Sequence, residues 1–295
     1  MTVGLFLGAW AIATLYLVQH GTDWIRPVAT LLVYGALLPA LAVWMTRATG
    51  AAPLAVDDPP RESIAMLLYV LLFYPIFVLG WLFSQVNDVF SPGQAREVVM
   101  LVVKLIMHVA LPTLLILALG GHVRAMWSAG LGRKGVLATL LVFSALLFGL
   151  SALSTPALER IAATGLAPAQ ALPWVLGAWL WASVQGGLCE EYLFRAVLQS
   201  RLTAWLGSPV TAIALTALIF ALAHVPGIYW RGTPDTNGWS SDPLEVMAYA
   251  IAMLAPLGVL FGVLWLRTRS LLLIVLVHSA LDALPHTASF FNLWR

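Results

Sequence analysis

Three short polar motifs in the last third of the chain have the residue types that hydrolytic sites use. The first is Glu190–Arg195, which opens with two acids, the second is His224, and the third pairs His278 with Asp282. Carboxylates and imidazoles are among the side chains that most often act as general acids and bases. Glu190, His224, His278 and Asp282 are therefore the candidate catalytic residues, and hydrolysis by an activated water is the chemistry that they suit.

The spacing of the first motif gives its two acids different roles. On a helix, Glu191 and Arg195 are i,i+4 neighbours and can form an ion pair. Glu190 is rotated by about 100° from Glu191 and need not share that partner. Glu190 is then free to act as a general base, with Glu191 and Arg195 as supporting residues. The alternative is that the acids only form buried salt bridges between helices.

The turn expected at Gly207 relates the first motif to the second. Glu190 and His224 are equally far from Gly207 along the chain, so on two antiparallel helices both lie about 25 Å from the turn. A lone His on an apolar helix face is more often a hydrogen-bonded core residue than a catalyst. The shared level favours a catalytic role for His224, with Phe220 one turn before it as a supporting residue.

The third motif leaves two mechanisms open. His278 and Asp282 share a helix face through their i,i+4 spacing, so Asp282 can fix His278 through its second ring nitrogen. Glu190, His224 and His278 could hold a catalytic zinc and leave a fourth position for water. Without metal, Glu190 and His224 would polarise the water and His278 would stabilise the oxyanion.

Other polar residues give weaker indications. Cys189 precedes the two acids, but a thiol in apolar surroundings is usually inert packing, which disfavours a cysteine nucleophile. Lys104 and His108 are i,i+4 neighbours within another apolar segment. Their spacing alone assigns them no role.

The composition indicates an integral membrane protein. Of 295 residues, 61% are hydrophobic and only 9% are charged, and the mean hydropathy is +0.92. A soluble enzyme of this size would have about a quarter of its residues charged. A formal net charge of +2 provides no basic stripe for nucleic acid, so no nucleic-acid partner is expected. The lipid bilayer is the expected surrounding.

Apolar runs long enough to cross a bilayer recur along the whole chain. A transmembrane helix needs about 20 mostly apolar residues, and lipid permits only helices or closed barrels. We therefore expect an all-α fold, a polytopic helical bundle of about eight to nine transmembrane helices. The nine candidate spans are 3–19, 28–46, 63–84, 98–119, 136–154, 173–203, 209–226, 244–267 and 270–286.

Basic residues in the short loops predict the orientation. The loops after the even-numbered spans hold more Arg and Lys than the opposite loops, and basic loops stay in the cytoplasm. The prediction is a cytoplasmic N-terminus, in a bacterial cytoplasmic membrane. Ionisable groups are costly at membrane depth, so those in the late spans mark the functional region.

These three motifs, in this order, resemble the CPBP family of intramembrane proteases, which includes the type II CAAX prenyl endopeptidases and the Abi proteins. The family pattern is Glu-Glu-x-x-x-Arg, then Phe-x-x-x-His, then His-x-x-x-Asn or Asp. It matches here at Glu190, Glu191 and Arg195, at Phe220 and His224, and at His278 and Asp282. The resemblance implies a catalytic core over residues 170–295 and a family-variable helical scaffold over residues 1–169.

The resemblance also implies roles. Glu190 and His224 would activate water for hydrolysis of a peptide bond in a membrane-associated protein or peptide. His278 and Asp282 would stabilise the oxyanion, or His278 would join a zinc site. The prenyl-protease members usually have Asn at the last position, so Asp282 weakens the expectation that the substrate is prenylated.

Two other functions compete with a protease. One is a non-catalytic immunity or chaperone-like membrane protein that retains the protease fold, although the complete motif set disfavours lost chemistry. The other is a transporter that uses the buried charges as a proton relay. The chain lacks the paired, interrupted helices in two halves that many transporters show, which disfavours that function.

Overall fold

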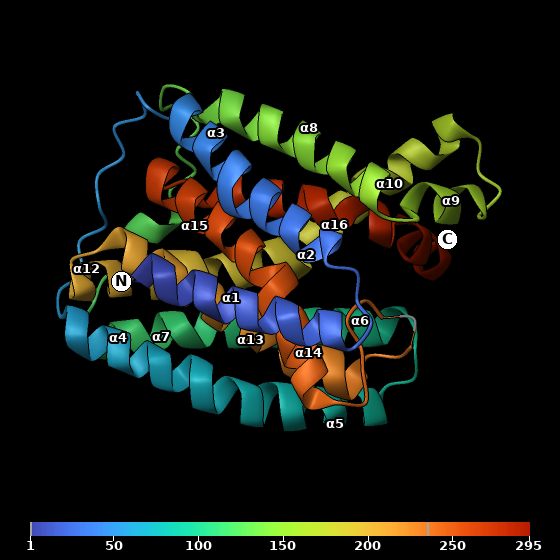
Figure 1. Cartoon of the computed structure of the whole chain (residues 1–295), viewed down its shortest axis with the longest axis horizontal. Helices are drawn as coiled ribbons and strands as arrows, with labels where there is room; N and C mark the ends of the chain where they lie inside the picture. The colour runs from blue at the N-terminus through green and yellow to red at the C-terminus, as the bar shows by residue number, and fades with distance from the viewer. Residues whose placement is uncertain (1, 235) are drawn as a thin grey trace.

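The computed structural model describes residues 2–234 and 236–295. That part of the chain is 80% helical and has no strands, which confirms the all-α expectation. Figure 1 shows long helices lying side by side along the longest axis of the molecule. Many of them change between α-helical and π-helical turns (labelled η) without a break in the chain direction.

The N-terminal half contains one short 3₁₀ helix, η4, between α7 and α8, and its other η elements are π-helical. Its elements are α1 Thr2–Gln19, α2 Ile25–Thr30, η1 Leu31–Leu37, α3 Leu38–Met45, α4 Pro59–Leu68, η2 Tyr69–Leu82, α5 Phe83–Val89, α6 Gln94–Leu105, η3 Ile106–Ala110, α7 Leu111–Ala118, η4 Arg124–Trp127, α8 Val136–Ser154 and α9 Ala157–Ala162.

The C-terminal half carries all three polar motifs. Its elements are α10 Pro168–Ala182, η5 Ser183–Leu188, α11 Cys189–Glu191, η6 Tyr192–Gln199, α12 Ser200–Leu206, α13 Pro209–Arg231, α14 Pro243–Tyr249, η7 Ala250–Leu254, α15 Ala255–Thr268 and α16 Leu271–Trp294. The two acids of the first motif lie in α11, between two π-helical segments. Such segments are frequent at functional sites.

Seven helices of the described residues are long and apolar enough to cross a membrane, so the chain is an integral membrane protein. They coincide with seven of the nine predicted spans. The predicted spans 63–84 and 173–203 are helical but do not belong to this set. The first includes residues 76–80, whose side chains lie outside the described part, and the second carries the charges of the first motif.

The last helix is longer than its sequence predicted. The expected end near residue 286 is wrong, because α16 continues through Pro285 to Trp294. Proline lacks the amide hydrogen that would bond the carbonyl one turn earlier. That carbonyl, of Leu281, instead accepts a hydrogen bond from Ser151 Oγ on α8 at 3.0 Å. The neighbouring helix therefore compensates for the proline.

The turn that relates the first two motifs is as expected. Gly207 follows α12 with φ +63°, a left-handed conformation that favours glycine. Ser208 then caps α13, its Oγ accepting a hydrogen bond from the Thr211 amide at 3.3 Å. The motif-bearing helix and α13 therefore form an antiparallel hairpin.

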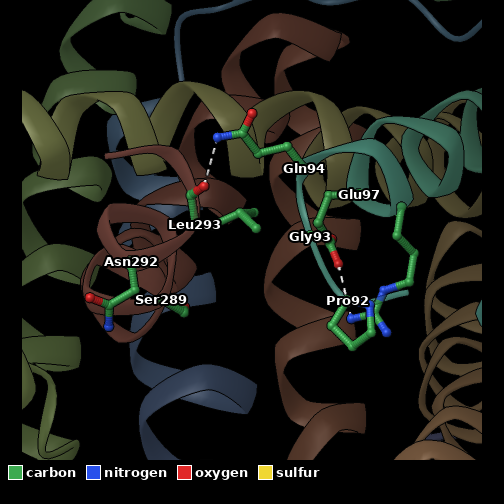
Figure 2. Close-up of a pocket in the computed structure, with 8 residues that line it drawn as sticks. Pro92, Gly93, Gln94, Glu97, Ser289, Asn292 and Leu293 are labelled. Atoms are coloured by element: carbon green, nitrogen blue, oxygen red, sulfur yellow. Dashed lines mark hydrogen bonds and ion pairs between the residues drawn. The ribbon is translucent and has the colours of Figure 1, made fainter. Parts of the chain in front are cut away.

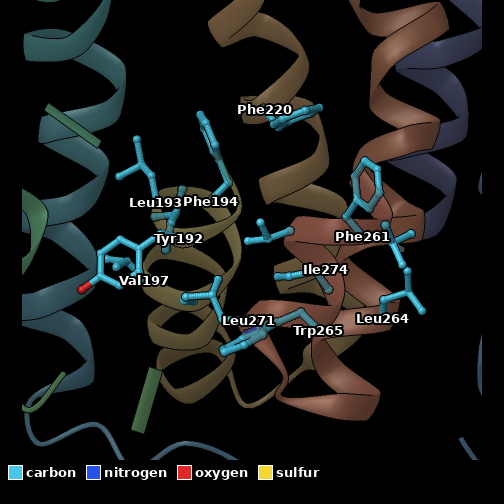
Figure 3. Packing of buried hydrophobic residues seen from close by; sticks show 14 of the residues in the cluster. Tyr192, Leu193, Phe194, Val197, Phe220, Phe261, Leu264, Trp265, Leu271 and Ile274 are labelled. Atoms are coloured by element: carbon cyan, nitrogen blue, oxygen red, sulfur yellow. The ribbon is translucent and has the colours of Figure 1, made fainter. Parts of the chain in front are cut away.

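The largest buried cluster draws side chains from both halves of the chain. Figure 3 shows Phe194, Phe220 and Phe261 pointing into it from η6, α13 and α15. α8 packs against α16, α3 against α15, and α4 against α12. Packing is thus continuous across the expected boundary at residue 170, and the separate functional roles of the two segments remain a prediction.

Candidate active site

Glu190 and two histidines from three different helices converge on one point. The Glu190 Oε2 atom on α11 lies 3.6 Å from His224 Nε2 on α13 and 3.8 Å from His278 Nε2 on α16. This oxygen is buried and has no hydrogen-bond partner. The two helices joined by the turn at Gly207 therefore place Glu190 and His224 at the same level, as the sequence predicted. The second and third motifs meet at the same carboxylate.

Each histidine is oriented through its other ring nitrogen. The Nδ1–H of His224 donates to the Phe220 carbonyl oxygen at 2.8 Å. The Nδ1–H of His278 donates to Glu191 Oε1 at 2.6 Å. With Nδ1 occupied in both rings, the two Nε2 atoms are the ones that face Glu190, and a water or substrate atom there could contact either.

Glu191 has two partners in the protein interior. Its Oε1 lies 3.2 Å from Arg195 Nη1, which confirms the ion pair expected from their spacing. The same oxygen binds His278, a contact that the sequence had suggested for Asp282. Asp282 does contact His278 as its i,i+4 spacing suggested, but at the other ring nitrogen, with Oδ2 3.5 Å from Nε2. Asp282 thus lies on the same side of the imidazole as Glu190.

Aromatic rings enclose the charged groups. The Arg195 guanidinium lies 4.1 Å from the centre of the Phe220 ring, within the range of a cation–π contact. The Phe261 ring stacks on His278 with centroids 4.7 Å apart and planes 5° apart. Sequence reasoning found Phe220 through its motif but missed Phe261, because an aromatic residue in an apolar span looks like ordinary core.

A glycine allows the first and third motifs to approach each other. An added Cβ at Gly187 would lie 2.6 Å from Ser279 Oγ and 2.7 Å from the Val275 carbonyl oxygen. Real Cβ atoms essentially never come so close. The absence of a side chain at Gly187 therefore brings η5 against α16 and lets Glu190 reach His278.

The site has an accessible side and a closed side. The side chains of Glu190, His224 and Asp282 are 22%, 30% and 34% exposed, whereas those of Glu191 and Arg195 are fully buried. These three groups form the accessible side of the site. The buried ion pair between Glu191 and Arg195 instead fixes the position of the His278 ring.

Lys104 and His108 form a wall next to the site. The Nδ1–H of His108 donates to the Lys104 carbonyl oxygen at 2.9 Å, and the Tyr74 hydroxyl donates to His108 Nε2 at 2.7 Å. η3, which carries His108, packs against α11. Lys104 lies four residues before His108, at the end of α6. His108 is thus satisfied within the protein, whereas Lys104 contributes a positive charge near the site.

Cys189 is buried and held within its own helix. Its thiol donates to the Val184 carbonyl oxygen at 3.4 Å. This contact favours a packing role over that of a nucleophile.

The three residues expected to bind zinc lie around one carboxylate oxygen. Among the described residues, no three His, Cys, Asp or Glu side chains are arranged to hold a metal ion. The set Glu190, His224 and His278 does not fit zinc as placed here. The protein groups alone can supply the proton transfers of hydrolysis, and metal analysis tests the need for zinc.

A surface pocket lies elsewhere, between the start of α6 and the end of α16. It encloses about 590 Å³ and is lined by residues that include Pro92, Gln94 and Asn292. Figure 2 shows Gln94 Nε2 donating across it to the Leu293 carbonyl oxygen, at 2.9 Å. None of the candidate catalytic residues lines this pocket.

Comparison with known proteins agrees with the motifs. Residues 172–284 match the family described as type II CAAX prenyl endopeptidase Rce1-like. The match contains all three motifs and confirms the family resemblance expected from them. No curated protein and no solved structure shows significant similarity to the chain.

Proposed function

We propose that this membrane protein with its Rce1-like segment is an intramembrane endopeptidase in which Glu190 and His224 activate water. The observation that carries the proposal is the buried, unpartnered Oε2 of Glu190, which faces two imidazole nitrogens within 4 Å. Such an oxygen needs a polar partner, because a buried acceptor without one costs about 1–3 kcal/mol. A water held among these three groups would supply it.

In the first step, the water oxygen attacks the carbonyl carbon of the substrate amide. Glu190 takes a proton from the water as the new carbon–oxygen bond forms. His224 lies beside the same carboxylate oxygen and polarises the water through Nε2. The carbonyl oxygen becomes an oxyanion, which needs a donor already in position. His278 provides that donor when its Nε2 is protonated. The Glu191 carboxylate, bound at Nδ1, then balances the positive charge of the ring.

In the second step, the tetrahedral intermediate collapses and the carbon–nitrogen bond breaks. The proton on Glu190 passes to the leaving nitrogen, so the products are a carboxylic acid and an amine. Glu190 returns to its carboxylate form. The protein groups thus balance every proton of the hydrolysis.

The substrate proposed is a membrane-associated protein or peptide. The family description names prenyl endopeptidases, so a peptide with a prenylated cysteine near its C-terminus is the first substrate to test. Asp282 is one of the more exposed groups of the site. As a carboxylate it can accept a substrate N–H, whereas it cannot donate to an oxyanion.

The test compares the wild-type protein with Glu190→Gln in lipid nanodiscs. The substrate is a fluorogenic farnesylated peptide, and the same peptide without the farnesyl group reports on prenyl dependence. Loss of a general base typically lowers the rate by about 10²–10⁴-fold. Glu159→Gln, at an exposed acid in α9, is the matched control and should retain wild-type activity.

Comparative proteomics provides an unbiased search for substrates. It compares membrane and secreted peptides from cells that express the wild-type protein, Glu190→Gln or Glu159→Gln. Peptides that depend on wild-type protein but disappear with Glu190→Gln would identify natural substrates. A folded Glu190→Gln protein that still cleaves would overturn the mechanism. A phenotype that persists in the inactive variant would favour the non-catalytic function.

A further inference from the structure

A glycine-rich basic loop lies against the turn that joins α15 and α16. The Leu271 amide at the start of α16 donates to the Ser128 carbonyl oxygen at 3.1 Å, and Ser270 Oγ donates to the Ala129 carbonyl oxygen. From the other end of the loop, Arg133 Nη1 donates to the Thr268 carbonyl oxygen at 2.5 Å. These contacts hold the loop 128–135 tightly over the turn.

Arg269 lies in this turn, with its guanidinium 5.5 Å from the centre of the Trp265 ring. It is only 3% exposed, and its backbone is left-handed with φ 46°. Its Nε and Nη1 atoms are buried and form no hydrogen bond. A buried guanidinium that lacks an acceptor is strongly unfavourable. Between two spanning helices, the structure therefore contains a cation whose buried Nε and Nη1 atoms lack an acceptor among the described residues.

The other charges near Arg269 are positive as well. Burial, and after it the positive charge of Arg133, lower the pKa of Arg269 to about 10. In the described part of the chain, no carboxylate acts on Arg269 in the opposite direction. Lys134 follows Arg133 directly in the loop.

The helix that starts at this turn adds to the positive potential. α16 begins at Leu271 and is 24 residues long, and the N-terminal end of such a helix dipole attracts anions. Its first amides are already bonded to Ser128 and Ser270. The helix end therefore contributes through its dipole, while the guanidinium groups would supply the donors.

We propose that Arg269 and Arg133 bind a phosphate group at the N-terminal end of α16, either in an anionic phospholipid headgroup or as free phosphate. Arginine suits this ligand because its planar fork donates to two phosphate oxygens at once. The place also suits it, because a turn between two spanning helices is expected at the membrane surface, where headgroups meet basic residues.

The site would act on α16, which also carries His278. Ser270 and Arg269 precede the helix directly, so a phosphate held there would fix the position of its first turn. The inference stands independently of the proposed protease function, because it predicts binding and stability rather than cleavage.

The experiment measures the melting temperature of the wild-type full chain in phosphatidylcholine nanodiscs. One arm replaces part of the lipid with phosphatidylglycerol, the second adds inorganic phosphate, and the third adds chloride at equal ionic strength. We expect the first arm, the second arm or both to raise the melting temperature above the chloride arm. A rise only with phosphatidylglycerol identifies a lipid ligand, and a rise only with phosphate identifies the free anion.

Three variants locate the site. Arg269→Asn removes the charge but tolerates the left-handed backbone, and Arg133→Gln removes the second cation. Each should weaken the affinity for the phosphate source by about tenfold or more, as expected for lost hydrogen bonds to a charged group. The same rise in melting temperature would then need a correspondingly higher concentration of that source. Arg47→Gln is the control, because Arg47 is exposed and contacts the Trp44 ring. It should keep the wild-type response.

Two outcomes would overturn the proposal. One is a melting temperature that rises no further in either phosphate arm than in the chloride arm, which leaves only ionic screening or no effect. The other is an unchanged response in both Arg269→Asn and Arg133→Gln. If either variant fails to fold, the three arms on the wild-type protein still decide between binding and screening.

Discussion

His278 donates its Nδ1–H to Glu191 over 2.6 Å, and the same carboxylate oxygen lies 3.2 Å from the Arg195 guanidinium. One buried oxygen thus joins an imidazole of the third motif to the cation of the first. Glu191 therefore positions His278, while Glu190 faces the accessible side of the site. The two adjacent acids have separate tasks because a helix turns them in different directions.

Replacing Glu191 with Gln should lower both stability and activity. The change leaves Arg195 as a buried cation without its counter-charge, which typically costs about 3–5 kcal/mol. It also weakens the hydrogen bond that orients His278. Unfolding in denaturant measures the first effect and peptide cleavage the second.

A companion variant separates these two effects. Glu191→Gln with Arg195→Met removes both charges and should recover much of the lost stability. Activity should remain low, because His278 still lacks its carboxylate partner. Full recovery of activity in the double variant would show that Glu191 serves stability alone.

Phe261→Leu should reduce cleavage through the position of His278. The variant loses the parallel ring contact at 4.7 Å, and the expected destabilisation is about 1–2 kcal/mol. Phe143→Leu is the control, because Phe143 is also fully buried but belongs to α8. Both variants should lose similar stability, and only Phe261→Leu should lose activity beyond that effect. Equal activity in the two would remove the specific role of Phe261.

Gly187→Ala should separate η5 from α16 and lower activity. The new methyl group would overlap Ser279 Oγ and the Val275 carbonyl oxygen, and such overpacking costs about 1–3 kcal/mol. Because the second contact is backbone, Ser279→Ala in the same chain should relieve only part of the effect. Gly149→Ala, which meets nothing within 4 Å, should be neutral or slightly stabilising. Wild-type cleavage by Gly187→Ala would contradict this prediction.

The pKa of His122 should lie above its ordinary value. A hydrogen bond of 2.6 Å to Asp57, together with the negative charge of that residue, raises it. The contact therefore stabilises the fold fully below the unfolded-state pKa near 6.5, and this contribution is lost as the pH rises through the higher folded-state value. An NMR titration of labelled histidine measures the shift. Asp57→Asn should lower the midpoint, and an unchanged midpoint would rule out the contact.

Chelation should leave the cleavage activity intact. The donors around Glu190 are not arranged in a group of three for a metal ion, and the proposed steps use protein groups only. Metal analysis and cleavage assays after treatment with a chelator provide the test. About one zinc per chain, with activity lost on chelation and restored by zinc, would instead assign Glu190, His224 and His278 as ligands.

Much of the site was predictable because helix geometry is regular. The i,i+4 spacing predicted the ion pair of Glu191 and Arg195, and counting from Gly207 placed Glu190 level with His224. Both predictions need only the rise and rotation of a helix. The membrane class followed from composition, because a chain with so few charges cannot cover a soluble surface.

The features that the sequence did not predict depend on contacts between helices far apart in the sequence. Nothing local to Glu191 indicates that His278 is its partner, and Phe261 has no motif. The end of α16 was mistaken because a proline normally ends a helix, whereas here Ser151 from α8 satisfies the freed carbonyl group. Such compensation becomes visible only when the neighbouring helix is in place.

The continuation of α16 past Pro285 has a consequence for how a peptide enters. Beyond the proline, Phe291 and Trp294 make edge-to-face contacts with Trp174 and Trp181 of α10. At its other end the helix is fastened by the loop contact of Ser270. We expect a helix secured at both ends to keep His278 in place on one side of Glu190. An incoming chain would therefore pass along the opposite side, where His224 is partly open.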